Sequence, residues 1–241
     1  MKAMRIGVTA VGIVLVQTFV CGVAIAPSVL LWNVVVGSAP ASSTARLLKA
    51  AFLVVPSYVL FALCLMPVSA FMTRATGGRT RPDAEWRIAD FPWPLMQWAH
   101  YMTATHLVRL IAGTLFRGSP LWTAYLRANG ARIGRRVFVN TLSIADHNLL
   151  ELGDDVVIGA DVHISGHTVE NGIVRTARVR VGPNVTIGVG SIIDIDVTIG
   201  PRCQVGALTF VPKHCTLESD ATYVGIPAHR ITRPSDSTSA V

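Results

Sequence analysis

Charged residues are scarce in this sequence of 241 residues, and acidic residues are nearly absent from its first half. Only 15% of the residues are charged, and the mean hydropathy is +0.50. This is too apolar for an ordinary soluble enzyme and predicts membrane segments. Residues 1–120 hold ten Lys and Arg against three Asp and Glu, whereas residues 121–241 hold eleven of each. Because the excess charge of +7 lies beside the apolar segments, it favours membrane flanks and excludes a nucleic-acid surface.

Cysteine is also rare, and no metal-binding or redox spacing is present. The four cysteines, Cys21, Cys64, Cys203 and Cys215, form no CxxC pair and no Cys/His ligand pattern. The spacing excludes a zinc finger and a thioredoxin-like motif, and it predicts no metal site. We expect the four thiols to be reduced and buried.

Two long runs without any charge lie near the start of the chain. Residues 6–37 are almost wholly apolar, and residues 50–72 are 23 consecutive uncharged residues. At about 1.5 Å per residue, a helix of either run can cross a hydrocarbon core of about 30 Å. The sequence therefore predicts a transmembrane helical hairpin over residues 1–75, with spans at about 6–35 and 50–72 in a lipid bilayer.

Basic residues around the two runs predict the orientation of this hairpin. Five basic residues lie at its outer ends and two in its turn: Lys2, Arg5, Arg74, Arg79 and Arg81 against Arg46 and Lys49. The excess at the outer ends places both termini in the cytoplasm of a multi-pass protein. A cleaved signal peptide is the alternative, because Ala24-Ile25-Ala26 resembles a cleavage site. However, the apolar run continues past that site and is longer than a usual signal-peptide core.

Residues 76–132 are predicted to form a linker and an interfacial amphipathic helix. Residues 91–116 contain one charge and group Trp93, Trp98 and Tyr101 near their start. Aromatic side chains of this kind favour the boundary between membrane and water. A third span and a buried core helix are the alternative interpretations of the same run.

From Ile133 the sequence repeats every six residues. The units are IGRRVF, VNTLSI, a seven-residue ADHNLLE, LGDDVV, IGADVH and ISGHTV, then VGPNVT, IGVGSI, IDIDVT, IGPRCQ, VGALTF, VPKHCT and LESDAT. The first position is aliphatic in twelve of these thirteen units. Fixed hexads predict a parallel β-helix in which three units form a triangular coil of about 18 residues. The aliphatic first position would fill the interior, and second-position glycine suits corners that need unusual φ and ψ values.

The hexads resemble the left-handed β-helix of the hexapeptide-repeat acyltransferases over about residues 118–230. The segment IGADVHISGH, which ends at His167, is similar to the family segment that ends in the catalytic histidine. The segment VGIPAHRI from Val224 is similar to the family motif that lies near the pantetheine of the acyl donor. The predicted fold is therefore a membrane hairpin and interfacial helix, then an all-β left-handed parallel β-helix over residues 133–230 and a flexible tail over residues 231–241.

A narrower likeness concerns the start of this region. The segment LFRGSPLWTAYLRANGARIGRR from Leu115, followed by LLELGDD and the histidine, is similar to the membrane-bound C-terminal modules of poly-lysine-synthetase-type nonribosomal peptide synthetases. Those modules join carrier-bound aminoacyl thioesters to amines. The likeness implies that an acyl or peptidyl carrier protein is a possible partner, because the chain has no adenylation or carrier sequence of its own.

The repeat is interrupted between the ISGHTV and VGPNVT units, and this interruption, with His167 at its edge, is the candidate site. Acyl transfer from a thioester needs a general base near neutral pH, which histidine supplies. With one slip residue, Ile133 stacks beneath Leu152, and the same offset places Asp146 and His147 below Ser165 and Gly166, next to His167. We therefore expect His167 to act as the base, with Asp146 or His147 orienting it. Residues 168–180 would form an extruded loop that covers this edge.

The resemblance also implies a place for the acyl donor. The donor would be acyl-CoA or a phosphopantetheine thioester, with no tightly bound cofactor, and the family active site usually lies between the subunits of a homotrimer. Guanidinium groups recognise phosphate, and the glycine–proline–alanine turn would lie near the pantetheine. The donor-binding candidates are Arg175, Arg178, Arg180, Gly225, Pro227 and Ala228.

The function predicted from the sequence is a membrane-anchored acyltransferase, with its catalytic domain on the cytoplasmic side of a bacterial plasma membrane. It would move an acyl or aminoacyl group to a hydroxyl or an amine. Two alternatives are a β-helix metalloenzyme of the carbonic-anhydrase type, which would use His147, His163 and His167, and a non-catalytic membrane scaffold.

Overall fold

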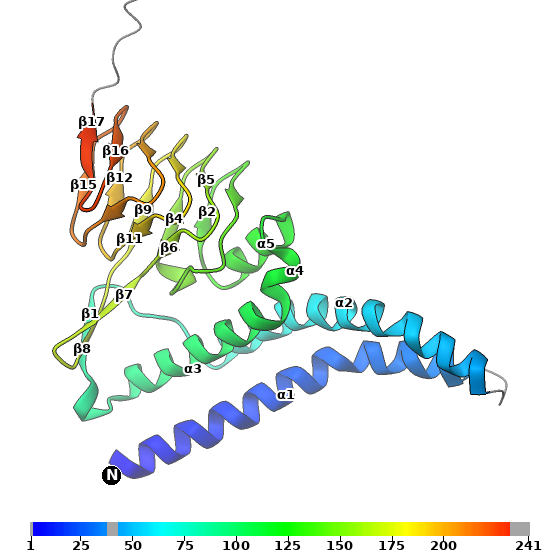
Figure 1. Cartoon of the computed structure of the whole chain (residues 1–241). Coiled ribbons are helices and arrows are strands. Elements are labelled where there is room, and N and C mark those ends of the chain that lie inside the picture. Colours follow the sequence, from blue (N-terminus) through cyan, green and yellow to red (C-terminus); the bar gives the residue numbers. More distant parts are fainter. Residues whose placement is uncertain (1, 38–42, 232–241) are drawn as a thin grey trace, which may run out of the picture. The chain divides into compact units, whose positions relative to one another are not determined.

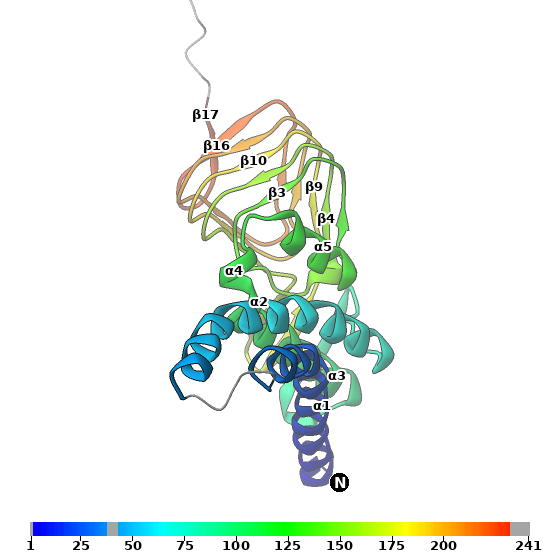
Figure 2. The same cartoon turned by 90° about the vertical axis from the view of Figure 1, so that its right-hand side faces the viewer.

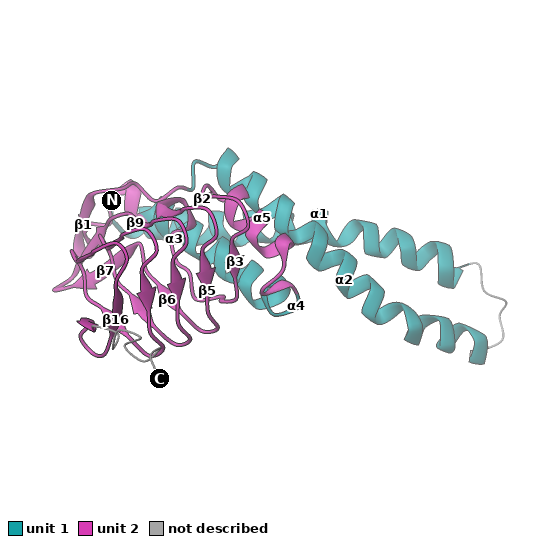
Figure 3. Cartoon of the chain, turned by 90° about the horizontal axis from the view of Figure 1, so that it is seen from above, with its two compact units in different colours: residues 1–78, 96–115 teal, residues 79–95, 116–241 magenta. Residues whose placement is uncertain are grey.

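The computed structural model describes residues 2–37 and 43–231 and divides the chain into two compact units (Figure 3). Unit 1 contains residues 1–78 and 96–115, and unit 2 contains residues 79–95 and 116–241. The predicted turn of the hairpin falls largely on residues 38–42, and the predicted tail falls on residues 231–241. Apart from Ile231, these two predictions concern residues outside the described ranges.

Unit 1 is helical and contains two long apolar helices, α1 (Lys2–Gly37) and α2 (Ser43–Ala75). Both are long and apolar enough to cross a membrane by length and composition. They pack against each other, and the buried Ser28 hydroxyl of α1 donates a hydrogen bond to the Ser57 carbonyl of α2 at 2.8 Å. Large apolar side chains such as Leu30 and Phe52 are exposed along both helices.

The predicted interfacial run is helical from Trp93 to Phe116. It consists of α3 (Trp93–Val108), a π-helical turn (Arg109–Gly113) and α4 (Thr114–Phe116). Within unit 1, the Tyr58 hydroxyl of α2 donates to the Ile111 carbonyl in the π-helical turn. A π-turn leaves carbonyl groups poorly paired along the helix, and this hydroxyl satisfies one of them.

Unit 2 is a parallel β-helix with three faces (Figures 1 and 2). The faces carry the strands in the orders β17-β16-β13-β10-β5-β3, β14-β11-β6 and β15-β12-β9-β4-β2. Figure 2 shows β3, β10 and β16 on one face and β4 and β9 on another. The strands are β2 (Arg132–Ile133), β3 (Phe138–Val139), β4 (Leu150–Leu152), β5 (Val157–Ile158), β6 (His163–Ile164), β9 (Val179–Val181), β10 (Thr186–Ile187), β11 (Ile192–Ile193), β12 (Thr198–Ile199), β13 (Gln204–Val205), β14 (Phe210–Val211), β15 (Thr216–Leu217), β16 (Thr222–Val224) and β17 (His229–Ile231).

The six-residue period of the sequence is the period of this coil. Ile187 pairs with Val205, and Ile193 pairs with Val211, so each strand lies beside the strand that is three hexads further along the chain. The aliphatic first positions are buried, with Ile187 and Ile193 both at 0% exposure. The prediction of three hexads in each coil around an aliphatic interior is therefore confirmed. The left-handed sense of the coil stays a prediction of the family resemblance.

The second-position glycines have a different role from the one predicted. They do not adopt positive φ; the fourth position of the hexads does so instead, for example at Asp155 (φ 58) and Asn184 (φ 57). A Cβ on Gly188 would lie 2.4 Å from the backbone nitrogen of Ala207 in the next coil. Glycine at position 188 therefore allows the close approach of stacked backbones, and the corner conformation is adopted at the fourth position, which is often Asp or Asn, residues that tolerate it.

A short helix covers the first coil. Helix α5 (Pro120–Ala128) begins at Ser119, whose hydroxyl accepts a hydrogen bond from the Trp122 amide at 3.4 Å. The buried Trp122 ring lies against the coil and donates from Nε1 to the Thr141 carbonyl at 3.0 Å. Because the open end of a β-helix would expose its apolar interior, α5 acts as a cap for that end.

We expect the Gly188→Ala substitution to lower the free energy of unfolding by about 1–3 kcal/mol, the usual cost of overpacking. The added Cβ meets the backbone of the next coil, which cannot move without displacing further coils. Chemical denaturation of the full chain in detergent measures the change. Val189→Ala is the control because Val189 is exposed and adjacent. Equal stability of the Gly188→Ala and Val189→Ala variants would contradict this account of the glycines.

Candidate active site

The interruption of the repeat is a β-hairpin rather than an irregular loop. Strands β7 (His167–Glu170) and β8 (Ile173–Thr176) pair antiparallel around Asn171 and Gly172. Both turn residues have positive φ, 50° and 72°, as a two-residue type I′ hairpin turn requires. The Asn-Gly pair between two β-rich tetrapeptides is the sequence signal that could have predicted this hairpin.

The hairpin lengthens one coil and leaves the pairing of the coils intact. Thr186 pairs with Gln204 on one side, three hexads further along the chain. On its other side Thr186 pairs with Val157, from which it is separated by almost five hexads. The additional residues leave the coil at one corner, and the parallel strands on both sides of the insertion remain neighbours.

A third strand of this small sheet comes from the predicted linker. Strand β1 (Ala84–Arg87) pairs antiparallel with β8, with Ala84 opposite Thr176. The buried Thr176 hydroxyl donates to the Arg81 carbonyl at 2.6 Å. Residues 79–95 thus belong to the same compact unit as the β-helix, which the sequence alone did not indicate.

Asp146 and His167 meet at the root of the hairpin. The imidazole Nδ1 of His167 lies 2.5 Å from Oδ2 of Asp146. The Asp146 side chain is fully buried, whereas the His167 side chain is 20% exposed. Because a carboxylate only accepts hydrogen bonds, a neutral His167 carries its proton on Nδ1 and donates it to Asp146. This tautomer places the lone pair on Nε2, the atom that can accept a proton from a substrate.

Two further side chains belong to this cluster and were not predicted. The buried Thr80 hydroxyl donates to Oδ1 of Asp146 at 2.7 Å. The Asn148 side chain donates to the Thr80 carbonyl at 2.7 Å and accepts from the Thr80 amide at 3.2 Å. Thr80 is 66 residues before Asp146 in the chain and lies in no repeat, so no sequence pattern indicated it.

The approach of Asp146 to the hairpin requires a glycine at position 166. A Cβ on Gly166 would lie 2.8 Å from Cβ of Asp146 and 3.1 Å from Cδ1 of Leu149. Asp146 itself adopts the left-handed conformation, with φ 53° and ψ 57°. Ile144 bridges Ile164, whereas the predicted offset would have placed it beside His163. This additional slip puts Asp146 beside Gly166 instead of Ser165.

The other two histidines near the interruption have different surroundings. His147 is buried, and its ring meets the Tyr125 ring edge-on at a centroid distance of 5.7 Å. His163 is exposed on β6. Of the two residues considered for orienting His167, Asp146 lies at hydrogen-bonding distance from its Nδ1. Within residues 2–37 and 43–231, no three His, Cys, Asp or Glu side chains gather as a metal site would require.

The predicted donor-binding arginines fall into two groups. The guanidinium groups of Arg178 and Arg180 form ion pairs with the Glu151 carboxylate at N–O distances of 3.0 and 3.7 Å. Arg132 pairs with the same carboxylate at 2.9 Å. Three guanidinium groups around one carboxylate leave a net positive surface patch on this face. Arg175 is separate and pairs with Glu85 of β1 at 3.1 Å.

The predicted glycine–proline–alanine turn lies on the last coil. Gly225, Pro227 and Ala228 belong to the turn between β16 and β17, where Gly225 has a φ of 96°. The Ala228 amide donates to the Phe210 carbonyl of β14 at 2.7 Å, which ties the turn to the preceding coil. This turn is therefore several coils away from the Asp146–His167 pair along the β-helix.

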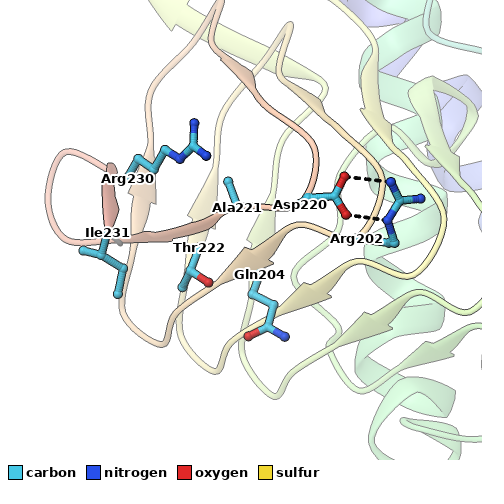
Figure 4. A pocket seen from close by; sticks show the side chains of 7 residues that line it. All are labelled: Arg202, Gln204, Asp220, Ala221, Thr222, Arg230 and Ile231. Carbon is cyan, nitrogen blue, oxygen red and sulfur yellow. Dashed lines mark hydrogen bonds and ion pairs between the residues drawn. The ribbon is translucent and has the colours of Figure 1, made fainter. Parts of the chain in front are cut away.

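A separate hollow of about 390 Å³ lies on the outer face of the last coils (Figure 4). Its charged side chains are engaged with each other or with neighbours: Arg202 binds Asp220 at 2.5 Å, and Arg230 binds Glu218 at 2.7 Å. Figure 4 shows Gln204 and Thr222 beside them, with no histidine or cysteine among the lining residues. The Asp146–His167 pair is therefore the better candidate for general acid–base chemistry.

Two perturbed groups near the coils are explained by their surroundings. Burial raises the pKa of the Cys203 thiol to about 11, so this interior side chain is not a thiolate nucleophile at neutral pH. A hydrogen bond from Lys213 lowers the pKa of Glu170 on the hairpin. The Lys213–Glu170 pair ties the extruded hairpin to the coil above it.

Comparison with known proteins adds a family likeness. No family model matches the chain. It is 30% identical to the galactoside O-acetyltransferase of Escherichia coli over 125 residues, which cover 48% of this chain and 60% of that protein. It is 29% identical to the delta-poly-L-ornithine synthetase of Acinetobacter baumannii over 112 residues, which cover 46% of this chain and 8% of that protein. The chain thus spans less than two thirds of the length of either relative.

Solved structures also match the chain, at low identity and low TM-score. A galactoside acetyltransferase in complex with coenzyme A matches with 20% identity and a TM-score of 0.44, over 56% of this chain and 83% of that one. A hexapeptide-repeat acetyltransferase of Vibrio cholerae in complex with acetyl coenzyme A matches with 23% identity and a TM-score of 0.40, over 45% and 63%. The two relatives found by sequence confirm the predicted resemblance to hexapeptide-repeat acyltransferases and the narrower one to a poly-amino-acid synthetase.

The ion pair on the hairpin predicts a pH dependence. Because the folded-state pKa of Glu170 is lowered, the pair stabilises the hairpin above the ordinary glutamate pKa of about 4.3 and loses this effect as the pH falls through the lowered value. We expect Glu170→Gln to speed hydrogen exchange of the amides of residues 167–176 at pH 7. The difference from wild type should vanish at acidic pH, as exchange measured after pulse labelling would reveal.

The control for this measurement is Glu218→Gln, which removes a pair with Arg230 away from the hairpin. It should leave exchange of residues 167–176 unchanged. Equal exchange in the Glu170→Gln variant and in wild type at pH 7 would show that the pair does not hold the hairpin.

Proposed function

We propose that this chain is a membrane-anchored acyltransferase that moves an acyl or aminoacyl group from a thioester to a hydroxyl or an amine. The observation that carries the proposal is the buried Asp146 carboxylate bound to His167 where the repeat is interrupted. A histidine fixed in one tautomer and partly open to solvent is suited to general-base chemistry. The likeness to a galactoside O-acetyltransferase supports the same reaction class.

In this mechanism Nε2 of His167 removes the proton from the hydroxyl or amine of the acceptor. The acceptor oxygen or nitrogen attacks the thioester carbonyl carbon and forms a tetrahedral intermediate. Its collapse breaks the carbon–sulfur bond, and the imidazolium returns the proton to the leaving thiolate. Asp146 stabilises the transient positive charge on His167 and keeps the ring oriented. The step requires no metal and no redox partner.

Coenzyme A and a carrier-bound phosphopantetheine are the two donors that the chain would accept. Both present a phosphate-bearing arm that ends in the same thioester. The patch of Arg132, Arg178 and Arg180 around Glu151 is the proposed phosphate contact, because guanidinium groups bind phosphate oxygens in pairs. The remaining candidates for contact with the donor are Arg175 and the turn of Gly225, Pro227 and Ala228.

The acceptor is proposed to be an amine or a hydroxyl that is handled close to the membrane. The similarity to a poly-L-ornithine synthetase favours an amine and an aminoacyl donor on a carrier protein. The similarity to a galactoside acetyltransferase favours a hydroxyl and an acyl-CoA donor. A subunit arrangement in which three copies share their active sites is expected from the family.

Helices α1 and α2 are proposed to span the lipid bilayer, with unit 2 in the cytoplasm of a bacterial cell. Leu30, Phe52 and other large apolar side chains exposed on these helices would be costly in water and favourable in lipid. The excess of basic residues at the outer ends of the helices supports this orientation.

Two alternative functions receive less support. A β-helix metalloenzyme would need His147, His163 and His167 around one ion, but His147 packs on Tyr125 and His167 is bound to Asp146. A non-catalytic scaffold would have no reason to bury a carboxylate against a partly exposed histidine, because burying such a charge is costly.

We expect His167→Ala to lower acyl transfer by about 10²–10⁴-fold, the usual contribution of a general base. The assay supplies acetyl-CoA and aminoacyl thioesters with a panel of amines and alcohols, and mass spectrometry identifies the products. Wild-type turnover with any pair defines the substrate used for the variants.

The matched control is His214→Ala, because His214 also lies on an aspartate, Asp196, at 2.9 Å, but both side chains are exposed. It should retain full activity. If His167→Ala is as active as His214→Ala, His167 is not the base.

Membrane anchoring has its own test. We expect the full chain to stay in the membrane pellet after extraction with alkaline carbonate and to enter solution only with detergent, because the two apolar helices would be embedded in lipid. Immunoblotting of the fractions measures the distribution, with a peripheral membrane protein as the released control. Release of the chain by carbonate alone would refute the two spans.

A further inference from the structure

We propose that Thr80 is a positioning residue for the Asp146–His167 pair and that residues 79–87 form a clamp which completes the site. The proposal rests on the acyltransferase function, since it assigns how the general base is held in the geometry it needs. Thr80 lies outside the hexapeptide repeats and precedes their first unit, which begins at Ile133. The β-helix therefore does not build its site alone.

The Asp146 carboxylate is the group that Thr80 acts upon. It is fully buried, and a buried charge is tolerated only where hydrogen-bond donors surround it. His167 lies at Oδ2, and the Thr80 hydroxyl donates to Oδ1. Because each oxygen faces a different partner, the carboxylate plane is fixed, and with it the direction from which Asp146 meets the imidazole ring.

Thr80 is in turn held by a residue that follows Asp146 closely in the chain. The Asn148 side-chain amide makes two hydrogen bonds to the main chain of Thr80, one as donor and one as acceptor. Asn148 is in the short 3-10 helix (His147–Leu149) that begins directly after Asp146. Thr80 is therefore bound twice to the same short segment: its hydroxyl is hydrogen-bonded to Asp146, and its main chain is hydrogen-bonded to Asn148 in the turn that follows Asp146.

The other end of the clamp is attached beside His167. Strand β1 pairs with β8, and the Thr176 hydroxyl of β8 donates to the Arg81 carbonyl. Thr176 is the residue directly opposite His167 in the β7–β8 hairpin. Residues 79–87 thus contact a close neighbour of each member of the pair, Asn148 for Asp146 and Thr176 for His167.

The test compares three variants of the full chain in detergent. Thr80→Val keeps the shape and removes the hydroxyl, whereas Thr80→Ser keeps the hydroxyl. Thr141→Val is the matched control, because Thr141 is also buried and its hydroxyl donates to the Val162 carbonyl at 2.8 Å, away from the pair. We expect Thr80→Val to lower kcat by about 10–100-fold, the usual effect of losing a hydrogen bond to a buried charge, with KM for the thioester nearly unchanged. Thr80→Ser and Thr141→Val should keep kcat within a few-fold of wild type.

A second readout does not depend on turnover. In protein with ¹⁵N-labelled histidine, the Nδ1 and Nε2 signals of His167, assigned with the His167→Ala variant, report its tautomer and hydrogen bonding. Thr80→Val should move these signals, and Thr141→Val should not. If wild type transfers no acyl group to any acceptor, the proposed function fails, and the ring signals alone decide whether Thr80 positions the pair.

Two results would overturn the proposal. One is a Thr80→Val variant with wild-type kcat and unchanged His167 signals. The other is a Thr80→Val variant that loses activity while the His167 signals stay in place, because that result would assign Thr80 a structural role only.

Discussion

The close stacking of one coil on the next is the constraint on which the rest of the structure depends. Backbone amides of each coil donate to carbonyls of its neighbour, as Gly188 does to Val205, and this fixes a strand spacing of about 4.8 Å. At that spacing a Cβ on Gly188 would collide with the backbone of the adjacent coil, so glycine is required at that position. The same spacing stacks the first positions into a continuous aliphatic interior. An insertion can therefore leave the coil only at a corner, and the hairpin of residues 167–176 does so.

The candidate site follows from that restriction. An extruded hairpin brings its first residue, His167, above the corner that carries Asp146, and Gly166 allows the two to approach. The burial that makes Asp146 an effective partner for an imidazole also makes it dependent on other donors. Thr80 meets this need from outside the repeat. A regular coil thus supplies the positions of the proposed catalytic pair, and irregular segments supply its hydrogen bonds.

The repeating coils of the β-helix could be predicted from the sequence, whereas the segments outside the repeat could not. The hexads were sufficient to place Ile187 and Ile193 in the interior and to set His167 near Asp146, because columns in a coil can be counted. The predicted offset between stacked coils is wrong at Ile144, where one additional residue puts Asp146 beside Gly166. The hairpin has a local sequence signal in its Asn-Gly turn. Thr80 and β1 had none, since a contact between residues 66 apart leaves no periodic trace when one partner lies outside the repeat.

The chain passes between its two compact units three times, after residues 78, 95 and 115. This path has a consequence for the order of events during biosynthesis. Residues 79–95 leave the ribosome long before their partners, because the hydrogen bond from Thr176 to Arg81 joins residues 95 apart. Residues 79–95 therefore lack these hydrogen-bond partners while the helix that follows them and the first coils are synthesised. The nascent chain therefore acquires its proposed chemistry late, when the hairpin has closed upon a segment synthesised well before it.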